Sequence, residues 1–423
     1  MTSSKSDVMI IGGGAVGLCS AYYLNKEGLS VTVLDQGEIG HGSSLRNAGY
    51  LSPSHFIPLA APGVFTQGLK WMLNPRSPLY IKPRLDPDFL KWSWNFAKSC
   101  NESKVQKAIP VLRDLLNASK DFTQKIASDT GIDFEIQKRG INLLFYSEKG
   151  RKKCEHELEI AHKIGMDAEM LNQQELQNRD PDIEFQAEGG LHFPGDMHLS
   201  PELFVNNLHR HLKQQGVQFF THTRVQSFEH NLNGPKQNLS KVITTKGVFE
   251  AKNFILAGGA WSAEILKPLK IKMLLQAGKG YSITVENPEI KPNSPYIFLE
   301  KRVAITPFSK SLRFAGTMEF SGINHHIREE RVEAISDALP FYFRNIPKLQ
   351  TKKHLVWCGL RPVTPDGMPY LGRLKQIPNL IVATGHAMLG ISFSALTGTV
   401  VRDLVAEFKS PYDLTLLNPN RFD

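Results

Sequence analysis

Cysteine is scarce in this chain of 423 residues, and its four copies are scattered. Cys19, Cys100, Cys154 and Cys358 form no C-x-x-C pair. This pattern gives no support for a zinc site or a redox-active disulfide, and no bound metal is expected. The four thiols are instead typical of reduced core residues in a cytoplasmic protein.

Long apolar runs are also missing, because none approaches the roughly 18 residues that a membrane-spanning helix needs. The N-terminal arm, MTSSKSD, is short and polar, and a nucleotide-binding motif follows it directly. A cleaved signal peptide would remove that motif, so we expect a cytoplasmic location. The hydrophobic content of 41% and charged content of 22% are ordinary for a globular protein. The length suits two domains.

The chain has no strong charge imbalance, because it contains 50 basic and 41 acidic residues, for a net charge of +9. The basic clusters are RKK at 151–153 and KPLKIK at 267–272. They are interpreted either as solvated faces or as sites of attraction to an anionic membrane surface. No nucleic-acid-binding motif accompanies the charge, so nucleic acid is not an expected partner.

The residues VMIIGGGAVG, at 8–17, combine a buried-strand pattern with closely spaced glycines. Gly12, Gly14 and Gly17 form G-x-G-x-x-G. In this pattern the first glycine permits a tight turn, the second lets the backbone approach a pyrophosphate, and the third lets a helix pack close to the strand. That helix is expected at about 15–27, ending before Gly28.

A second apolar run, 31–34, ends at Asp35. A carboxylate at this offset, about 20 residues on, accepts hydrogen bonds from a ribose hydroxyl. An acid here disfavours a 2′-phosphate, so FAD or NAD is favoured over NADP. The alternative is a plain tight turn between a strand and a helix.

The rest of the chain alternates between the two expected domains. An α/β fold is predicted, with a Rossmann-like FAD-binding domain built from discontinuous segments and an α+β substrate domain with a mixed or antiparallel sheet. The FAD-binding domain is placed at 1–55, 195–265 and 355–423. The substrate-binding domain is placed at 56–194 and 266–354, with a helical block at 56–130 and strands over 280–320.

The glycine motif and seven further stretches carry a family resemblance: GGGAVG, SSLRNAGYLSP, LAAPGV, GLKWM, GKGYSIT, VAITPF, WCGLRPVTPDGMPYLGR and ATGHAMLG. On these stretches, nearly the whole chain resembles the bacterial FAD-dependent D-amino-acid dehydrogenases. More broadly, it is similar to the group of glycine oxidase, sarcosine oxidase and D-amino-acid oxidase.

The resemblance implies FAD as the cofactor and a set of residues around it. The pyrophosphate is expected on the glycine turn, the adenosine ribose at Asp35, and the flavin beside the 43–49 loop, where Arg46 is bulkier than the family pattern. The expected cofactor-binding residues are Gly12, Gly14, Ala15, Val16, Gly17, Asp35, Gln36, Ser43, Ser44, Asn47, Ala48, Gly49, Val225, Gly258, Gly259, Gly385, His386, Leu389 and Gly390.

The resemblance also implies that Arg361 anchors the substrate carboxylate, because an arginine fork matches a carboxylate bidentately. The alternative is a structural ion pair of Arg361 with Asp366. Tyr281 and His386 are the other expected catalytic residues, and Arg302 is the next candidate for the carboxylate anchor.

The expected reaction is hydride transfer from the α-carbon of a D-amino acid to FAD, giving an imino acid that hydrolyses to a 2-oxo acid. Electrons are expected to pass to a quinone or the respiratory chain, with the protein peripheral on the inner face of the cytoplasmic membrane. Open alternatives are a D-proline or hydroxy-D-proline dehydrogenase, an oxygen-using glycine or D-amino-acid oxidase, a NAD-dependent dehydrogenase, and an FAD-binding subunit of a larger complex.

Overall fold

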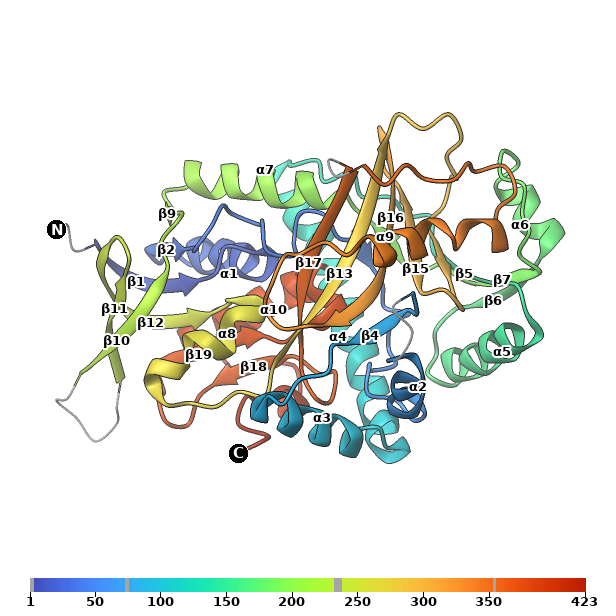
Figure 1. The fold of residues 1–423 in the computed structure, drawn as a ribbon. Helices are drawn as coiled ribbons and strands as arrows, with labels where there is room; N and C mark the ends of the chain where they lie inside the picture. The colour runs from blue at the N-terminus through green and yellow to red at the C-terminus, as the bar shows by residue number, and fades with distance from the viewer. Residues whose placement is uncertain (1–3, 73–75, 232–237, 353–354) are drawn as a thin grey trace.

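The computed structural model describes residues 4–72, 76–231, 238–352 and 355–423 (Figure 1). In this part of the chain the first sheet has eight strands. In spatial order they are β10 (Val225–Asn231), β11 (Asn238–Thr244), β12 (Gly247–Leu256), β1 (Ser4–Ile11), β2 (Val31–Leu34) and β9 (Gln218–Phe220), with β19 (Leu380–Thr384) beside β12 and β18 (Tyr370–Arg373) beside β19. Strands β9, β2, β1, β12 and β19 run parallel. Parallel strands are covered on both faces, which explains the unbroken apolar runs in β1 and β19.

The second sheet is mixed and has nine strands among the described residues. They are β17 (Val356–Val363), β13 (Gln276–Glu286), β16 (Ser311–Phe320), β15 (Val303–Pro307), β14 (Tyr296–Phe298), β5 (Ile141–Phe145), β7 (Gly189–Phe193) and β6 (Glu169–Asn172), with β4 (Leu79–Ile81) beside β16. A separate short pair joins β3 (Tyr50–Leu51) to β8 (Met197–His198). Figure 1 shows the two large sheets toward opposite ends of the molecule, with β13 and β17 near its middle.

Three helices form the main apolar layer: α1 (Ala15–Lys26), α10 (Gly390–Ala406) and α4 (Glu102–Thr130). Gly398 lets α10 approach α1 closely, because a Cβ at this position would lie 2.6 Å from the carbonyl oxygen of Cys19. The stretch Ala387–Ala406 is long and apolar enough to cross a membrane, with a mean hydropathy of 1.3. However, 67% of it is buried inside the structure, as in the core helix of a globular protein.

The remaining helices surround the second sheet or cover the outer face of the first. They are α2 (Val64–Trp71), α3 (Pro87–Ser99), α5 (Glu148–Lys163), α6 (Gln173–Arg179), α7 (Pro201–Gln214), α8 (Ser262–Ile265) and α9 (Glu329–Ser336). The predicted helical block at 56–130 thus contains three separate helices. Helix α7 begins where its sequence signals place it, after the capping residue Ser200 and with Pro201 in the first turn.

The first sheet draws its strands from distant parts of the chain, as the predicted discontinuous FAD-binding domain requires. One strand, β17, lies in a different sheet from the one that the predicted domain boundaries imply. Strand β17 falls within 355–423, but it pairs with β13 along its whole length and therefore belongs to the second sheet. Its sequence, VWCGLRPV, is equally compatible with either sheet, and only the pairing decides between them.

The buried histidine His198 makes the stability of this fold depend on pH. Its side chain is 1% exposed and its Nε2 lies 3.1 Å from the carbonyl oxygen of Pro307. Burial lowers its pKa from 6.5 to about 4. Between these two values the unfolded chain binds a proton that the folded chain does not, so this group's contribution to stability is present above pH 6.5 and is lost as the pH falls toward 4.

We expect His198→Gln to reduce the dependence of the unfolding free energy on pH between these values, by up to about 1.4 kcal/mol per pH unit. Glutamine keeps a donor for Pro307 but takes up no proton. Urea unfolding followed by tryptophan fluorescence measures the slope, and an unchanged slope in the variant would contradict the assignment.

Candidate functional site

The glycine turn after β1 lies in close contact with the end of β12. Gly12 has φ +115°, and a Cβ at this position would lie 2.3 Å from the carbonyl oxygen of Ala257. A Cβ on Gly17 would lie 1.9 Å from the carbonyl oxygen of Gly12. Both positions therefore exclude every other residue, and they bring the first turn of α1 against the carboxyl ends of two parallel strands.

Asp35, at the end of β2, faces the same turn. Its Oδ2 accepts from the backbone N–H of Gly13 at 2.7 Å, and its Oδ1 accepts from that of Gly37 at 2.9 Å. Burial raises the pKa of this carboxyl, while the two backbone donors oppose that rise. Each oxygen has a second lone pair, so the carboxylate still has acceptor capacity for a ligand's hydroxyls.

A single cavity of about 1470 Å³ runs from Asp35 along the glycine turn to the inner face of the second sheet. Ligand pockets are typically about 300–1,000 Å³, so this one has room for a dinucleotide and a substrate together. Most of the predicted cofactor residues line it: Gly12, Gly14, Ala15, Val16, Asp35, Gln36, Ser43, Ser44, Asn47, Ala48, Gly49, Val225, Gly258, Gly259, His386, Leu389 and Gly390. Their individual contacts with a cofactor stay predictions.

Two predicted cofactor residues do not line the cavity. Gly17 lies behind the turn, against Gly12, and Gly385 has φ +81° with its Cα facing Thr364 and Tyr370. Both are needed for backbone shape, because a side chain at either position would collide with its neighbours.

The 43–49 loop is held by its own polar groups beside the start of α1. Asn47 donates from Nδ2 to the carbonyl oxygens of Ser43 and Ser44, and its Oδ1 accepts from the N–H of Gly49 at 2.8 Å. Ser44 accepts from the N–H of Ala15 at 3.0 Å. The loop therefore presents a fixed backbone to the cavity. Arg46 borders the same cavity.

Arg361 enters the cavity from β17 and crosses the neighbouring strand β13 over Gly280. A Cβ on Gly280 would lie 2.1 Å from Nη1 of the arginine, so glycine leaves room for the guanidinium in this position. Nη1 donates to the carbonyl oxygen of Thr317 at 2.9 Å. Burial lowers the pKa of Arg361 to about 10, which leaves the guanidinium charged at neutral pH.

The alternative partner of Arg361 is occupied elsewhere. Asp366 accepts two hydrogen bonds from Arg421, at 2.7 and 2.9 Å. In the described part of the chain, Arg361 forms no ion pair within 4.0 Å. A buried guanidinium without a carboxylate partner is well suited to bind an anionic ligand.

Tyr281 borders the cavity, but its hydroxyl takes part in the polar network around Lys279 and Glu319. Alternate residues of a strand face opposite sides, and Gly280 faces the arginine. The hydroxyl of Tyr281 donates to Glu319 at 2.7 Å. Burial, followed by that carboxylate, raises the pKa of Tyr281 far above its ordinary value. The predicted contact of this hydroxyl with the substrate therefore lacks support from the geometry.

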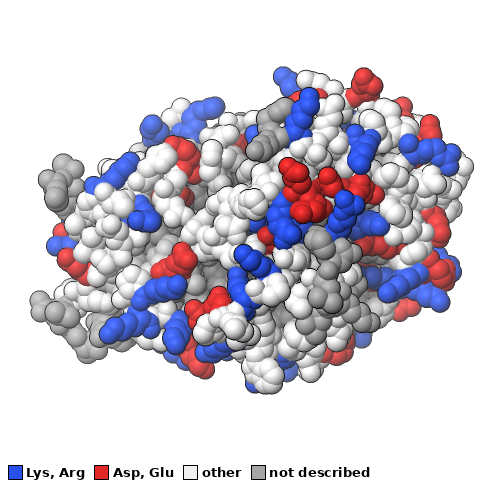
Figure 2. Space-filling model, in the orientation of Figure 1, with Lys and Arg blue, Asp and Glu red and all other residues white. Residues whose placement is uncertain are grey.

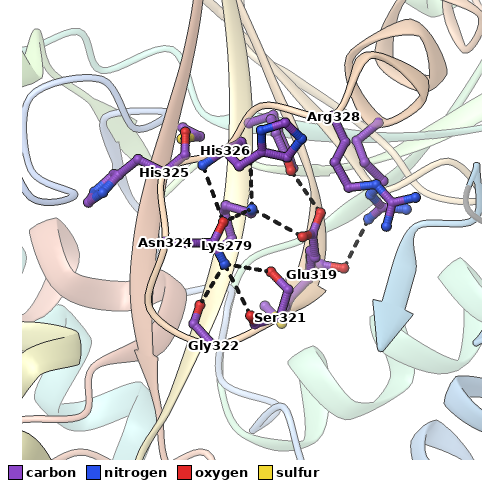
Figure 3. A network of polar contacts seen from close by, with 12 residues as sticks. Lys279, Glu319, Ser321, Gly322, Asn324, His325, His326 and Arg328 are labelled. Carbon is purple, nitrogen blue, oxygen red and sulfur yellow. Dashed lines mark hydrogen bonds and ion pairs between the residues drawn. The ribbon is translucent and has the colours of Figure 1, made fainter. Parts of the chain in front are cut away.

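Lys279 and Glu319 form the centre of that network, 3.1 Å apart and each 1% exposed. Lys279 also donates to the side chain of Asn324 and to the carbonyl oxygen of His326, at 2.7 and 2.8 Å (Figure 3). These contacts fix the loop that carries His325, whose ring stacks on Trp261 at the cavity wall. Satisfied networks of this kind hold a loop in one conformation.

His386 lies in the loop between β19 and α10. Its Nε2 is 3.0 Å from the hydroxyl oxygen of Thr397, and burial lowers its pKa to about 3. The ring is therefore neutral and weakly basic at neutral pH, which favours a structural role for its side chain over the predicted role as catalytic base. Its backbone borders the cavity together with Leu389 and Gly390.

A β-bulge in β16 is a feature that the sequence did not reveal. Lys279 pairs with Glu319 and Tyr281 pairs with Gly316, so two residues of β16 stand opposite Gly280. One of them, Thr317, has φ +61°, which a β-branched residue rarely adopts. The bulge turns the carbonyl of Thr317 toward Arg361. Bulges commonly redirect groups beside active sites in this way.

The residues at the site fit a flavin dinucleotide. The evidence is the side-chain-free cradle at Gly12, the acceptor capacity of Asp35, and the N-terminal N–H groups of α1, which suit a pyrophosphate.

Comparisons with known proteins agree with this fit. A family model described as FAD dependent oxidoreductase matches residues 7–404. The chain is 30% identical over 406 residues to a D-amino acid dehydrogenase from Vibrio atlanticus, covering 95% of this chain and 96% of that one. It is 31% identical over 421 residues to a D-amino acid dehydrogenase from Bradyrhizobium diazoefficiens, covering 98% of each chain. Its fold matches a glycine oxidase structure from Geobacillus kaustophilus with a TM-score of 0.78 and 22% identity, over 100% of both chains.

We expect Asp35→Asn to weaken FAD binding by roughly 10- to 100-fold, the usual effect of losing a hydrogen bond to a charged acceptor. Fluorescence titration of the apoprotein with FAD measures the change. Glu250→Gln, which alters an ion pair with Lys241 at the outer part of the same sheet, is the control and should bind FAD normally. Normal affinity in Asp35→Asn would contradict the role of Asp35.

Proposed function

We propose that the substrates of this protein are D-amino acids. The chain belongs to the family of FAD-dependent oxidoreductases, so the expectation of an FAD-dependent enzyme is confirmed. The proposal rests on one observation above the others, the charged and unpaired guanidinium of Arg361 in the cavity. The relatives named D-amino acid dehydrogenase, which match nearly the full chain, support it. FAD would supply the acceptor for the hydride.

The reaction breaks the Cα–H bond as the nitrogen lone pair forms a C=N bond. Two electrons and the hydrogen leave the substrate, and water then converts the imino acid to a 2-oxo acid and ammonia. Arg361 binds the substrate carboxylate and the carbonyl of Thr317 holds the guanidinium in place. A substrate fixed at its carboxylate presents its α-carbon in one orientation, which is the main contribution of positioning to catalysis.

The substrate amine must be neutral before the C–H bond breaks. His386 is a poor base for this step, because its pKa is lowered to about 3. The nearby cation of Arg361 and removal from water both disfavour an ammonium group, so binding itself promotes release of the proton. The lowered pKa of His386 therefore argues against abstraction of the amine proton by this side chain.

The electron acceptor is proposed to be a quinone or another membrane component rather than oxygen, with the protein bound peripherally to the membrane. The surface that supports this lies on and before α3. Leu85, Leu90 and Trp94 are 96%, 53% and 64% exposed, which is unusual for large apolar residues. Lys91 and Lys98 are exposed on the same helix. We call these five residues the α3 face.

The surroundings of the α3 face suit an anionic lipid surface. Lys91 borders a shallow depression together with Lys270 and Lys272, so the basic 267–272 cluster adjoins the helix. Figure 2 shows basic and acidic residues interspersed over the face of the molecule that it draws. Apolar side chains flanked by lysines are typical of interfacial helices, which bind anionic lipid through both features.

The activity is tested with the flavin-loaded enzyme and a panel of D- and L-amino acids that includes D-proline, first with a dye acceptor and then with oxygen alone. We expect dye reduction with D-amino acids and little hydrogen peroxide. Peroxide formed as fast as dye is reduced would indicate an oxidase, and turnover of D-proline alone would indicate a cyclic imino acid dehydrogenase.

We expect Arg361→Gln to lower kcat/KM for D-amino acids by roughly 30- to several-thousand-fold. An unpaired carboxylate in a desolvated site costs about 2–5 kcal/mol. Arg361→Lys keeps the charge but loses the fork, so it should still be impaired. Both variants should keep their FAD, since the residue faces the substrate. Arg344→Lys, at an exposed position, is the control; loss of FAD from the Arg361 variants would place Arg361 in the cofactor site instead.

For the membrane contact, we expect the protein to sediment with phosphatidylglycerol vesicles but not with phosphatidylcholine vesicles. Leu90→Ser combined with Trp94→Ser should abolish that sedimentation because it removes apolar area from the α3 face. Phe341→Ser removes an exposed aromatic residue at another surface and should leave it unchanged. Equal sedimentation of both variants would remove the α3 face from the proposal.

A further inference from the structure

We propose that Arg302 and Lys153 form a second anion-binding subsite in the cavity, which receives the distal carboxylate of a dicarboxylic amino acid substrate. This inference rests on the proposed function, because it names the substrate side chain that the same cavity accepts. Both residues border the cavity, Arg302 from the turn between β14 and β15 and Lys153 from α5.

The two side chains lie deep in the protein but remain accessible to solvent. Burial lowers the pKa of Arg302, and it lowers that of Lys153 to about 8, with the charge of Arg302 as the second cause. Yet both side chains are exposed, because they border the cavity. Within the described ranges, neither makes a side-chain hydrogen bond, nor an ion pair within 4.0 Å. Two cations that repel each other across a cavity are stabilised by an anion placed between them.

The acidic residues nearby, Glu300 and Glu157, form no ion pair with either cation in the described part of the chain. Glu300 is already satisfied, since it accepts from the hydroxyls of Tyr342 and Ser147 at 2.6 and 2.8 Å and from the N–H of Tyr146 at 3.2 Å. Glu157 also borders the cavity, and burial raises its pKa while the charges of Lys153 and Arg302 oppose that rise. Both cations therefore keep their N–H donors for a ligand, and such donors suit a carboxylate rather than an ammonium group.

The sheet places Arg302 close to the proposed carboxylate anchor. Val303 pairs with Gly316, so Arg302 lies beside Thr317, whose carbonyl oxygen holds the guanidinium of Arg361. Arg361 thus reaches Thr317 from β17 across β13, whereas Arg302 lies in the turn before β15 on the other side of β16, and both border the same cavity. A ligand with a carboxylate at each end would bind Arg361 with one and Arg302 with the other.

The backbone is strained at both Arg302 and Thr317. Arg302 has φ +55° and Thr317 has φ +61°. The hydroxyl oxygen of Thr317 is also buried without a hydrogen-bond partner in the described structure. Strained residues and unsatisfied polar atoms each have an energetic cost, and they concentrate where a ligand is held.

The test compares two ligands of equal chain length, glutarate with two carboxylates and pentanoate with one. Their binding to the FAD-loaded enzyme is followed by the change in flavin absorbance. We expect glutarate to bind roughly 10- to 100-fold more tightly than pentanoate, because a hydrogen bond between charged groups contributes this much. Arg302→Gln and Lys153→Gln should reduce that preference to near unity. Equal binding of the two acids by the unaltered enzyme would overturn the proposal.

Lys152→Gln is the matched control, because Lys152 precedes Lys153 on α5 but is 71% exposed beside Glu148. It should retain the preference for glutarate. Arg302→Lys keeps the charge without the fork and should retain part of the preference, which separates loss of the subsite from loss of folding. FAD content and the thermal unfolding midpoint are measured for each variant. If Arg302→Lys is folded but shows no preference for glutarate, the preference depends on the planar fork of Arg302.

Turnover gives an independent measure. D-Glutamate and D-glutamine differ in the charge of the side chain, and we expect Arg302→Gln to lower kcat/KM for D-glutamate while leaving D-glutamine nearly unchanged. Failure of the proposed function would instead abolish turnover of every D-amino acid while the glutarate preference remained. A preference for D-lysine that is lost in Glu157→Gln would overturn the subsite in favour of a cation site.

Discussion

The close contact between Gly12 and the end of β12 is the constraint on which the rest of the site depends. With only a hydrogen atom on Gly12 and on Gly17, β1, β12 and α1 meet where no side chain fits. The N-terminal N–H groups of α1 and the carboxylate of Asp35 consequently open into one cavity. Any Cβ here would displace strand or helix and would separate the cofactor-binding groups from the second sheet.

The second sheet has a different role, because it positions charge rather than backbone. Its inner face presents Arg361 and Arg302 on either side of the bulge at Thr317. Its opposite face, at Lys279 and Tyr281, is closed by a network in which each charge has a partner (Figure 3). One strand, β13, thus separates paired charges from unpaired ones. The paired side gives rigidity, whereas the unpaired side retains the capacity to bind.

The parts of this site that the sequence predicts are those encoded over short distances. The turn from Gly12 to Gly17 and the acid at Asp35 belong to one strand–helix–strand unit, whose geometry follows from local sterics. The bulge at Thr317 and the direction of Tyr281 depend on the register between β13 and β16, which no local pattern specifies. Lys153 illustrates the same limit, since the RKK cluster gives no sign that its last residue faces a cavity while Lys152 faces solvent.

An unpaired cation withdrawn from water, such as Arg361, is costly to folding, and its persistence here is informative. An arginine or lysine taken out of water without an anion loses much of its hydration energy. The sheet could have placed a protein carboxylate beside Arg361, but the nearest candidate in sequence, Asp366, pairs with Arg421 instead. A fold that leaves such groups open is stabilised by whatever anion occupies them, by an amount that grows with the ligand concentration. Substrate binding and the stability of the second sheet are therefore coupled through the guanidinium of Arg361.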